Sequence, residues 1–316
     1  MRYINDFHEG DNITGIYLCK QKNSAITKNG KEYENLTLAD KTGSLNCKIW
    51  EPNSMGIGDF GVNDYVEVHG RVSVFNGALQ LAIDRAFKAT EGSYDPADYL
   101  PVSSKDPQQM IQQLDKYINS VQTPYLRLLL ESLFVEDVQL REAFIKHSAA
   151  KSIHHGFVGG LLQHTLAVCD LCEFYAQRYS IINRDLLITA ALCHDIGKTR
   201  ELSPFPTNDY TNEGQFLGHI IIGVEIVSEK IREIKGFPKL RAEELKHCIL
   251  SHHGEYEYGS PKKPAIIEAV ALNFADNTDA KLEAITEILE NNPNTDPANP
   301  WMGYSKIFDT NIRPTD

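Results

Sequence analysis

The spacing of apolar residues changes once along this chain of 316 residues. From about residue 12 to residue 90, apolar and polar residues alternate, which is typical of strands with one buried face. From residue 107 onward, apolar residues recur every three or four positions, as in helices that bury one side. Residues 91–106, "EGSYDPADYLPVSSKD", follow neither period and contain several breakers. We therefore predict an all-β domain over residues 1–90, a linker over residues 91–106 and an all-α domain over residues 107–316.

The first domain has the pattern of a small closed barrel. The turn signals "TKNGKE", "DKTG" and "FNG" separate its strands, and a longer link, "EPNSMGIGDFGVN", stands between the third and the fourth. The predicted strands are "NITGIYLCKQ", "EYENLTLAD", "SLNCKIW", "YVEVHGRVSVF" and "ALQLAIDRAF". Five strands with one long link fit a Greek-key barrel of the OB type.

Barrels of this type often bind single-stranded nucleic acid by stacking bases on aromatic side chains beside cationic loops. Each aromatic residue alone is as readily explained by packing at the barrel rim, but as a set they make single-stranded RNA or DNA the leading ligand. The candidates are Tyr33, Trp50, Phe75, Lys28, Lys31 and Arg71. The net charge of −12 argues against a protein that coats duplexes, which is normally basic.

Two features indicate a cytoplasmic location with no membrane contact. No apolar run reaches the roughly 18 to 20 residues that span a bilayer, and the start "MRYINDFHEGDN" lacks the pattern of a signal peptide. The six cysteines are therefore expected to be reduced thiols. The CxxC of Cys169 and Cys172 falls within a helical pattern and has no second CxxC to complete a zinc site. The sequence leaves the oligomeric state undecided, because an exposed barrel on a linker is able to pack against a second copy and form a homo-oligomer.

Histidines and aspartates interrupt the apolar faces of the predicted helices in the second domain. The helices are expected at about 107–120, 124–134, 137–147, 159–179, 184–195, 213–235, 241–252 and 264–290. The interrupting residues are His164, His194, Asp195, His219, His252, His253 and Asp276. A lone histidine on an apolar face is more often a satisfied core residue. Seven such residues on five helices favour a common ligand.

That ligand is expected to be a pair of metal ions. Burying an unpaired imidazole or carboxylate costs on the order of several kcal/mol. The seven residues must therefore satisfy one another or a cation. Imidazole and carboxylate together suit Mn²⁺, Fe²⁺, Zn²⁺ or Co²⁺. Seven ligands are too many for one tetrahedral site and suit two octahedral ions that share an aspartate and a water. The neighbours His194 and Asp195 then supply one ligand to each ion, or Asp195 bridges both.

The series H…HD…H…HH…D, with Lys198 three residues after Asp195, resembles the HD-domain phosphohydrolase superfamily. The strings "HHGFVGGLLQHT", "HDIGK", "LSHHGEYEYGSPKKP" and "NFADNTDAKL" look like those of YhaM-type 3′-to-5′ exoribonucleases. The segment "TKNGKEYENLTLADKTGSLNCKIW" is similar to the OB domain that precedes the HD domain in those enzymes. The resemblance runs over roughly residues 9–310.

The resemblance implies a bacterial, metal-dependent exonuclease that releases nucleoside 5′-monophosphates from the 3′ end of single-stranded RNA, with single-stranded DNA as a second candidate substrate. It implies two divalent ions, Mn²⁺ first, with Co²⁺, Fe²⁺ or Zn²⁺ as alternatives, held by the seven residues above. Asp195 and Lys198 are the implied catalytic residues, and Lys198 would contact the scissile phosphate. Gly160 stands where certain three-metal relatives have a carboxylate, which favours two ions.

Other polar residues of the helical domain carry weaker predictions. Lys151, His154, His155 and Arg200 are candidates for the substrate path, as are Lys262 and Lys263, although a charge near a helix end is usually solvated surface. Asp279 follows Asp276 by three residues and is expected to orient a ligand histidine. The alternative function is an HD phosphohydrolase of a small nucleotide or a cyclic dinucleotide, which the "TKNGK" barrel and the lack of a "GYP" triplet disfavour. A purely structural metal site is disfavoured by Lys198.

Overall fold

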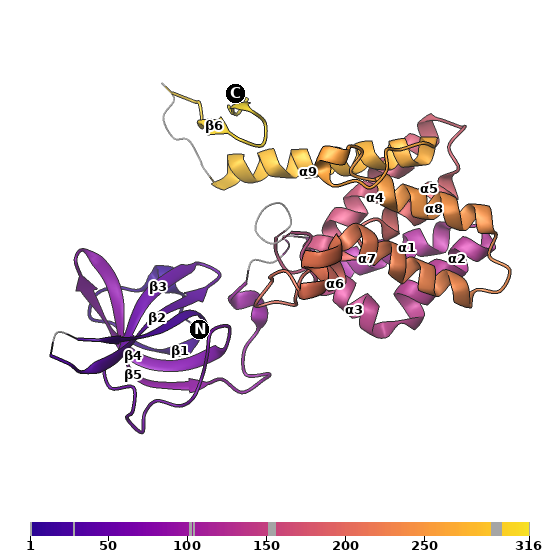
Figure 1. The fold of residues 1–316 in the computed structure, drawn as a ribbon. Coiled ribbons are helices and arrows are strands. Elements are labelled where there is room, and N and C mark those ends of the chain that lie inside the picture. The colour runs from indigo at the N-terminus through magenta and orange to yellow at the C-terminus, as the bar shows by residue number, and fades with distance from the viewer. Residues whose placement is uncertain are drawn as a thin grey trace. The chain divides into compact units, whose positions relative to one another are not determined.

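The computed structural model describes residues 2–27, 29–100, 103, 105–150, 156–291 and 299–315. The chain divides into two compact units, Met1–Val102 and Ser103–Asp316. The first is a β-barrel and the second is helical (Figure 1). The predicted architecture, an OB-type barrel followed by a helical domain, is confirmed.

The barrel consists of β1 (Asn12–Ile26), β2 (Glu32–Asp40), β3 (Gly43–Ile49), β4 (Tyr65–Phe75) and β5 (Ala78–Lys88). Its strand order is β1-β2-β3-β5-β4, closed by pairing of β1 with β4. Only β3 and β5 run parallel among these pairs, which is the five-stranded topology of an OB barrel. β1 closes the barrel because it pairs with β4 through its first half and with β2 through its second. Gly70 lies where β4 and β5 shift register, and a Cβ there would lie 2.3 Å from the Ala82 carbonyl oxygen.

Residues 96–100, which we expected to lie in a linker, pack on the barrel instead. Tyr99 and Leu100 are buried, and the ring of Tyr94 stacks on Tyr65 with centroids 3.9 Å apart. Asp98 accepts a hydrogen bond of 2.7 Å from the Tyr3 hydroxyl. The prediction was wrong because the segment, although rich in prolines and serines, also contains Tyr99 and Leu100, which the barrel buries.

The helical unit contains α1 (Pro107–Ser120), α2 (Pro124–Glu131), α3 (Val138–Lys146), α4 (Gly160–Arg178), α5 (Arg184–Cys193), α6 (Lys198–Glu201), α7 (Asn212–Glu233), α8 (Lys239–Ser251) and α9 (Ile267–Asn291). A π-helical turn, Ser132–Glu136, follows α2, and a short hairpin, β6 (Tyr304–Ser305) and β7 (Thr310–Asn311), ends the chain. Asp106 and Asn183 begin α1 and α5 as N-caps, since their side chains accept from Gln108 N and Leu186 N. Among the described residues, no helix offers a stretch long and apolar enough to cross a bilayer.

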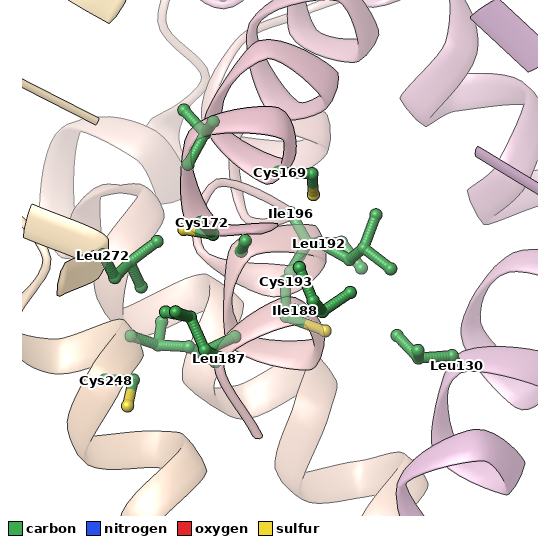
Figure 2. Packing of buried hydrophobic residues seen from close by; sticks show 14 of the residues in the cluster. Leu130, Cys169, Cys172, Leu187, Ile188, Leu192, Cys193, Ile196, Cys248 and Leu272 are labelled. Carbon is green, nitrogen blue, oxygen red and sulfur yellow. The ribbon is translucent and has the colours of Figure 1, made fainter. Parts of the chain in front are cut away.

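α5 lies in the middle of the helical core. Every residue from Leu186 to Cys193 is buried, and Figure 2 shows Leu187, Ile188 and Leu192 among apolar side chains of the surrounding helices. Cys193 and the cysteines of α4 and α8 also lie in this cluster, and all six cysteines are free thiols. Burial raises the pKa of the Cys193 thiol to about 12. The core therefore holds the C-terminal end of α5 rigidly at the point where His194 and Asp195 follow.

Candidate metal centre

Five helices bring the predicted ligands together. α4 carries His164, the end of α5 carries His194 and Asp195, α7 carries His219, the end of α8 carries His252 and His253, and α9 carries Asp276. The turn after α5 runs directly against α7, since a Cβ at Gly197 would lie 2.0 Å from the His219 carbonyl oxygen. Glycine in "HDIGK" therefore permits the close approach that places Asp195 beside His219.

Each of the five imidazoles has its Nδ1 atom held by an acceptor. The acceptors are Asp279 Oδ2 for His164 (2.6 Å), Ala191 O for His194 (2.7 Å), Glu201 Oε1 for His219 (3.0 Å), Ile249 O for His252 (2.7 Å) and Tyr258 O for His253 (2.8 Å). Carbonyl and carboxylate oxygens only accept, so each Nδ1 carries the proton. A neutral ring then presents the lone pair of Nε2, which is how histidines are held in metal sites.

The ligand atoms form two groups of three. His164, His194 and Asp276 make one group and His219, His252 and His253 make the other, and within each group the ligand atoms lie within 4.8 Å of one another. Asp195 joins the groups. Its Oδ2 lies 3.5 Å from His164 Nε2 and 3.4 Å from His194 Nε2, and its Oδ1 lies 3.5 Å from His219 Nε2.

These donors fit a cation better than they fit one another. The buried atoms Asp195 Oδ1, His219 Nε2 and His252 Nε2 have no hydrogen-bond partner within the described part of the chain. His164 Nε2 and His194 Nε2 lie 3.2 Å apart, so two lone pairs face each other when both rings are neutral. An unsatisfied buried polar atom costs about 1–3 kcal/mol, and metal ions bound at the two groups would relieve these atoms.

The electrostatics of the site also favour positive charge. Burial lowers the pKa of His164, but Asp276 and Asp279 outweigh it and raise this pKa to about 10. Burial raises the pKa of Asp195, but Lys198 and the surrounding histidines hold it well below its usual range. The Lys198 Nζ atom lies 2.6 Å from Asp195 Oδ2. Asp195 is therefore a permanent carboxylate between the two groups, with one fixed cation at its side.

A cavity of about 600 Å³ opens beside the first group. His164, Lys198, His253 and Asp276 line it on the side of the metal centre. A molecule bound in this cavity would therefore lie beside predicted ligands of both groups and beside Lys198.

Comparison with known proteins identifies the family of this chain. The family model "HD domain" matches residues 161–281. The chain is 33% identical over 285 residues to the 3′-5′ exoribonuclease YhaM of Geobacillus sp. (strain WCH70), covering 90% of this chain and 87% of that one. It is 33% identical over 289 residues to the YhaM of Bacillus subtilis (strain 168), covering 90% of both. The chain belongs to the YhaM family of 3′-5′ exoribonucleases. Among solved structures, the second OB-fold domain of replication protein A from Methanococcus maripaludis is 22% identical and covers 30% of this chain and 98% of that one, with a TM-score of 0.24.

In this YhaM-family chain, the residues predicted to bind substrate differ in where the structure places them. Lys28, Lys151, His154 and His155 lie outside the described residues. Arg200 does not line the cavity, because Glu213 engages it through an Nε to Oε2 bond of 3.1 Å. Lys263 likewise pairs with Glu255.

On the barrel, Tyr33 and Trp50 lie together with ring centroids 5.2 Å apart, and Lys48 lies over Tyr33 at 4.9 Å. No feature of the sequence singled out Lys48. Lys31 and Arg71 are exposed, and Phe75 is exposed at the end of β4. The barrel therefore presents a tilted pair of aromatic rings, Tyr33 and Trp50, with the Lys48 ammonium over Tyr33.

Two residues that orient the centre were missed. Glu201 holds His219, and Asn273 Nδ2 donates to the His252 carbonyl oxygen at 2.7 Å. The Asn273 side chain also packs against Gly254, which has φ of 80° and would bring a Cβ within 2.5 Å of it. Neither residue stands at a recognisable spacing from the ligand it orients. Asp279, by contrast, orients His164 as expected.

Proposed function

We propose that this protein is a metal-dependent 3′-5′ exoribonuclease that hydrolyses single-stranded RNA to nucleoside 5′-monophosphates. The observation that carries the proposal is the position of Asp195, whose two oxygens face two separate groups of metal-ligating atoms beside a cavity. Membership of the YhaM family supports cleavage in the 3′-to-5′ direction and RNA as the substrate.

The two groups are proposed to hold one divalent ion each, Mn²⁺ in the first place, with Asp195 shared between them. When bound, such a pair lowers the pKa of water at the site and neutralises charge on the reacting phosphate oxygens. The imidazole tautomers are set in advance by Asp279, Glu201 and three main-chain carbonyls, so the Nε2 atoms need not reorient. Binding therefore requires little rearrangement of the chain.

Lys198 is proposed to contact a non-bridging oxygen of the scissile phosphate. Its ammonium group lines the cavity, and Asp195 fixes it at 2.6 Å. A fixed cation of this kind stabilises the charge that develops on phosphate in the transition state. Release of a 5′-monophosphate requires the 3′ oxygen of the upstream nucleotide to leave, so the terminal nucleotide must enter the cavity with its 5′-phosphate at the metal end.

The barrel is proposed to hold the strand upstream of the cleaved end. Tyr33 and Trp50 offer stacking surfaces that accept any base, and Lys48 lies beside them. Because capture of a strand is separate from the chemistry, loss of the aromatic pair should raise KM for long RNA and leave kcat largely unchanged.

The direct test is incubation of the purified chain with Mn²⁺ and a 5′-labelled single-stranded oligoribonucleotide. We expect a ladder that shortens from the 3′ end and nucleoside 5′-monophosphates as the product. The same sequence with a 3′-phosphate or in a blunt duplex should react more slowly, and an oligodeoxyribonucleotide measures tolerance of DNA. Release of 3′-monophosphates would contradict the proposed cleavage of the bond to the upstream 3′ oxygen. Hydrolysis of a cyclic dinucleotide with no shortening of RNA would favour the alternative HD phosphohydrolase.

A further inference from the structure

The cavity beside the metal centre has a second wall that plays no part in metal binding. This part of the lining contains Tyr258, Asn277, Ala280 and Lys281, in addition to Lys198 and the predicted ligand residues. A volume of about 600 Å³ lies within the range of roughly 300–1,000 Å³ that is typical of small-molecule sites. The space is therefore sufficient for more than a phosphate group.

One face of α9 connects the two walls. Asn273, Asp276, Asn277, Ala280 and Lys281 recur at intervals of three and four residues, so their side chains lie on the same side of the helix. Asp276 belongs to the metal centre, and Lys281 lies five residues farther along, at a rise of about 7.5 Å. Asn277 and Lys281 are exposed, and neither has a hydrogen bond or ion pair within the described ranges of the chain. The Asn277 and Lys281 side chains on this face are therefore available to a ligand.

Tyr258 is tied to the metal centre through its main chain. It ends the 3₁₀ turn Tyr256–Tyr258, and its carbonyl oxygen accepts from Nδ1 of the ligand His253 at 2.8 Å. Tyr258 lines the cavity, and 71% of the residue surface is exposed. Tyr256 in the same turn does not line the cavity and lies beneath the Lys263 ammonium, 5.5 Å from its ring centroid. The turn thus anchors the main chain of Tyr258 beside His253, a predicted metal ligand, at the edge of the cavity.

We infer that the cavity is a nucleoside site in which the terminal base of the substrate stacks on Tyr258 and the Asn277 amide hydrogen-bonds to its polar groups. The inference rests on the proposed function, which supplies the phosphate at the metal end. Ala280, between Asn277 and Lys281, leaves space for a planar group. Stacking is tolerant of sequence because every base has a π-face, which suits an enzyme that must accept each new 3′ end.

The test is calorimetric titration of the full chain, loaded with Mn²⁺, with AMP and with ribose 5-phosphate. AMP should bind more tightly than ribose 5-phosphate, since only AMP carries a base. Tyr258→Ala should weaken AMP binding by at least about fivefold, the lower end for loss of one base stack, and should leave ribose 5-phosphate unaffected. Tyr258→Phe should bind AMP like the parent, and Tyr256→Ala is the matched control, because it removes a neighbouring exposed tyrosine outside the cavity.

Equal affinity of the parent for AMP and ribose 5-phosphate would overturn the inference. So would parental AMP affinity in Tyr258→Ala, or a loss in Tyr258→Phe as large as that in Tyr258→Ala. The titration needs no cleavage of RNA, so it tests the nucleoside site separately from the proposed exoribonuclease activity. A chain that fails to shorten RNA yet binds AMP through Tyr258 would refute the proposed polymer and support the nucleoside site.

Discussion

Glu201 provides the sharpest test of how the metal centre is built. α7 breaks at Gly218, where φ is 70° and ψ is 158°, and the next residue is the predicted ligand His219. Glu201 Oε1 accepts from the His219 backbone N at 2.9 Å and from its Nδ1 at 3.0 Å. The same oxygen therefore caps the second half of α7 and orients the imidazole. Glu201→Ala removes both contacts, whereas Glu201→Gln keeps a carbonyl oxygen in place and removes only the charge.

The expected magnitudes follow from these two contacts. Loss of the cap should lower the free energy of unfolding of metal-free protein by about 0.5–2 kcal/mol. Loss of the orienting partner should weaken metal binding by about 10- to 100-fold, which equals roughly 1.4–2.8 kcal/mol. Glu201→Ala should show both losses. Glu201→Gln should retain most of the stability and lose part of the metal affinity.

Two measurements separate these effects. Urea unfolding in the presence of a chelator reports the cap, and titration of metal-free protein with Mn²⁺ reports the orientation of His219. Glu213→Gln is the matched control, because Glu213 lies in the first turn of the same helix and pairs with Arg200 rather than with a ligand. If Glu201→Ala binds Mn²⁺ as tightly as the parent, His219 is not a metal ligand held in this way.

Three further outcomes are expected. Asp195→Ala should reduce the metal content from about two ions per chain, abolish cleavage and leave the circular dichroism spectrum unchanged; a single tightly held ion with intact activity would contradict the shared site. Lys198→Ala should keep its metal and lose roughly 10²-fold in kcat, so a variant as fast as the parent would exclude its contact with phosphate. Burial lowers the pKa of His147, and its bond to the Leu202 carbonyl offsets this only in part. The unfolded chain therefore binds a proton first as the pH falls below about 6.5, and stability decreases there. His147→Gln should lessen the decline in urea midpoint between pH 7.5 and pH 5.5, and an equal decline would refute this assignment.

The elements and the ligand set were predictable because their signals are local. Alternating residues marked β1 to β5, and apolar residues that recur every three or four positions marked the helices. The cluster of histidines and aspartates could be predicted because imidazoles and carboxylates are costly to bury on apolar helix faces unless they bind one another or a cation. The same reasoning found Asp279, since a spacing of three residues puts it near the side of α9 that carries Asp276.

What escaped prediction depends on contacts between distant segments. Glu201 reaches His219 only because α7 breaks at Gly218, and nothing in "GQFLGHI" distinguishes a break from a continuous helix. Asn273 meets the His252 carbonyl across two helices. The packing of Tyr99 on the barrel depends on the closed sheet, which no single strand reveals. In each case the partner is set by tertiary packing rather than by spacing along the chain.

The charges around the centre bear on the number of ions. Asp195, Asp276, Asp279 and Glu201 contribute four carboxylates, and Lys198 contributes one ammonium, so with neutral imidazoles the cluster carries a net charge of minus three. One divalent ion would leave minus one, which repels a phosphodiester. Two divalent ions would give plus one, which attracts it. Since the interaction of such charges is strong in a buried site, the charge balance favours two ions and a monoanionic phosphodiester as the group that they receive.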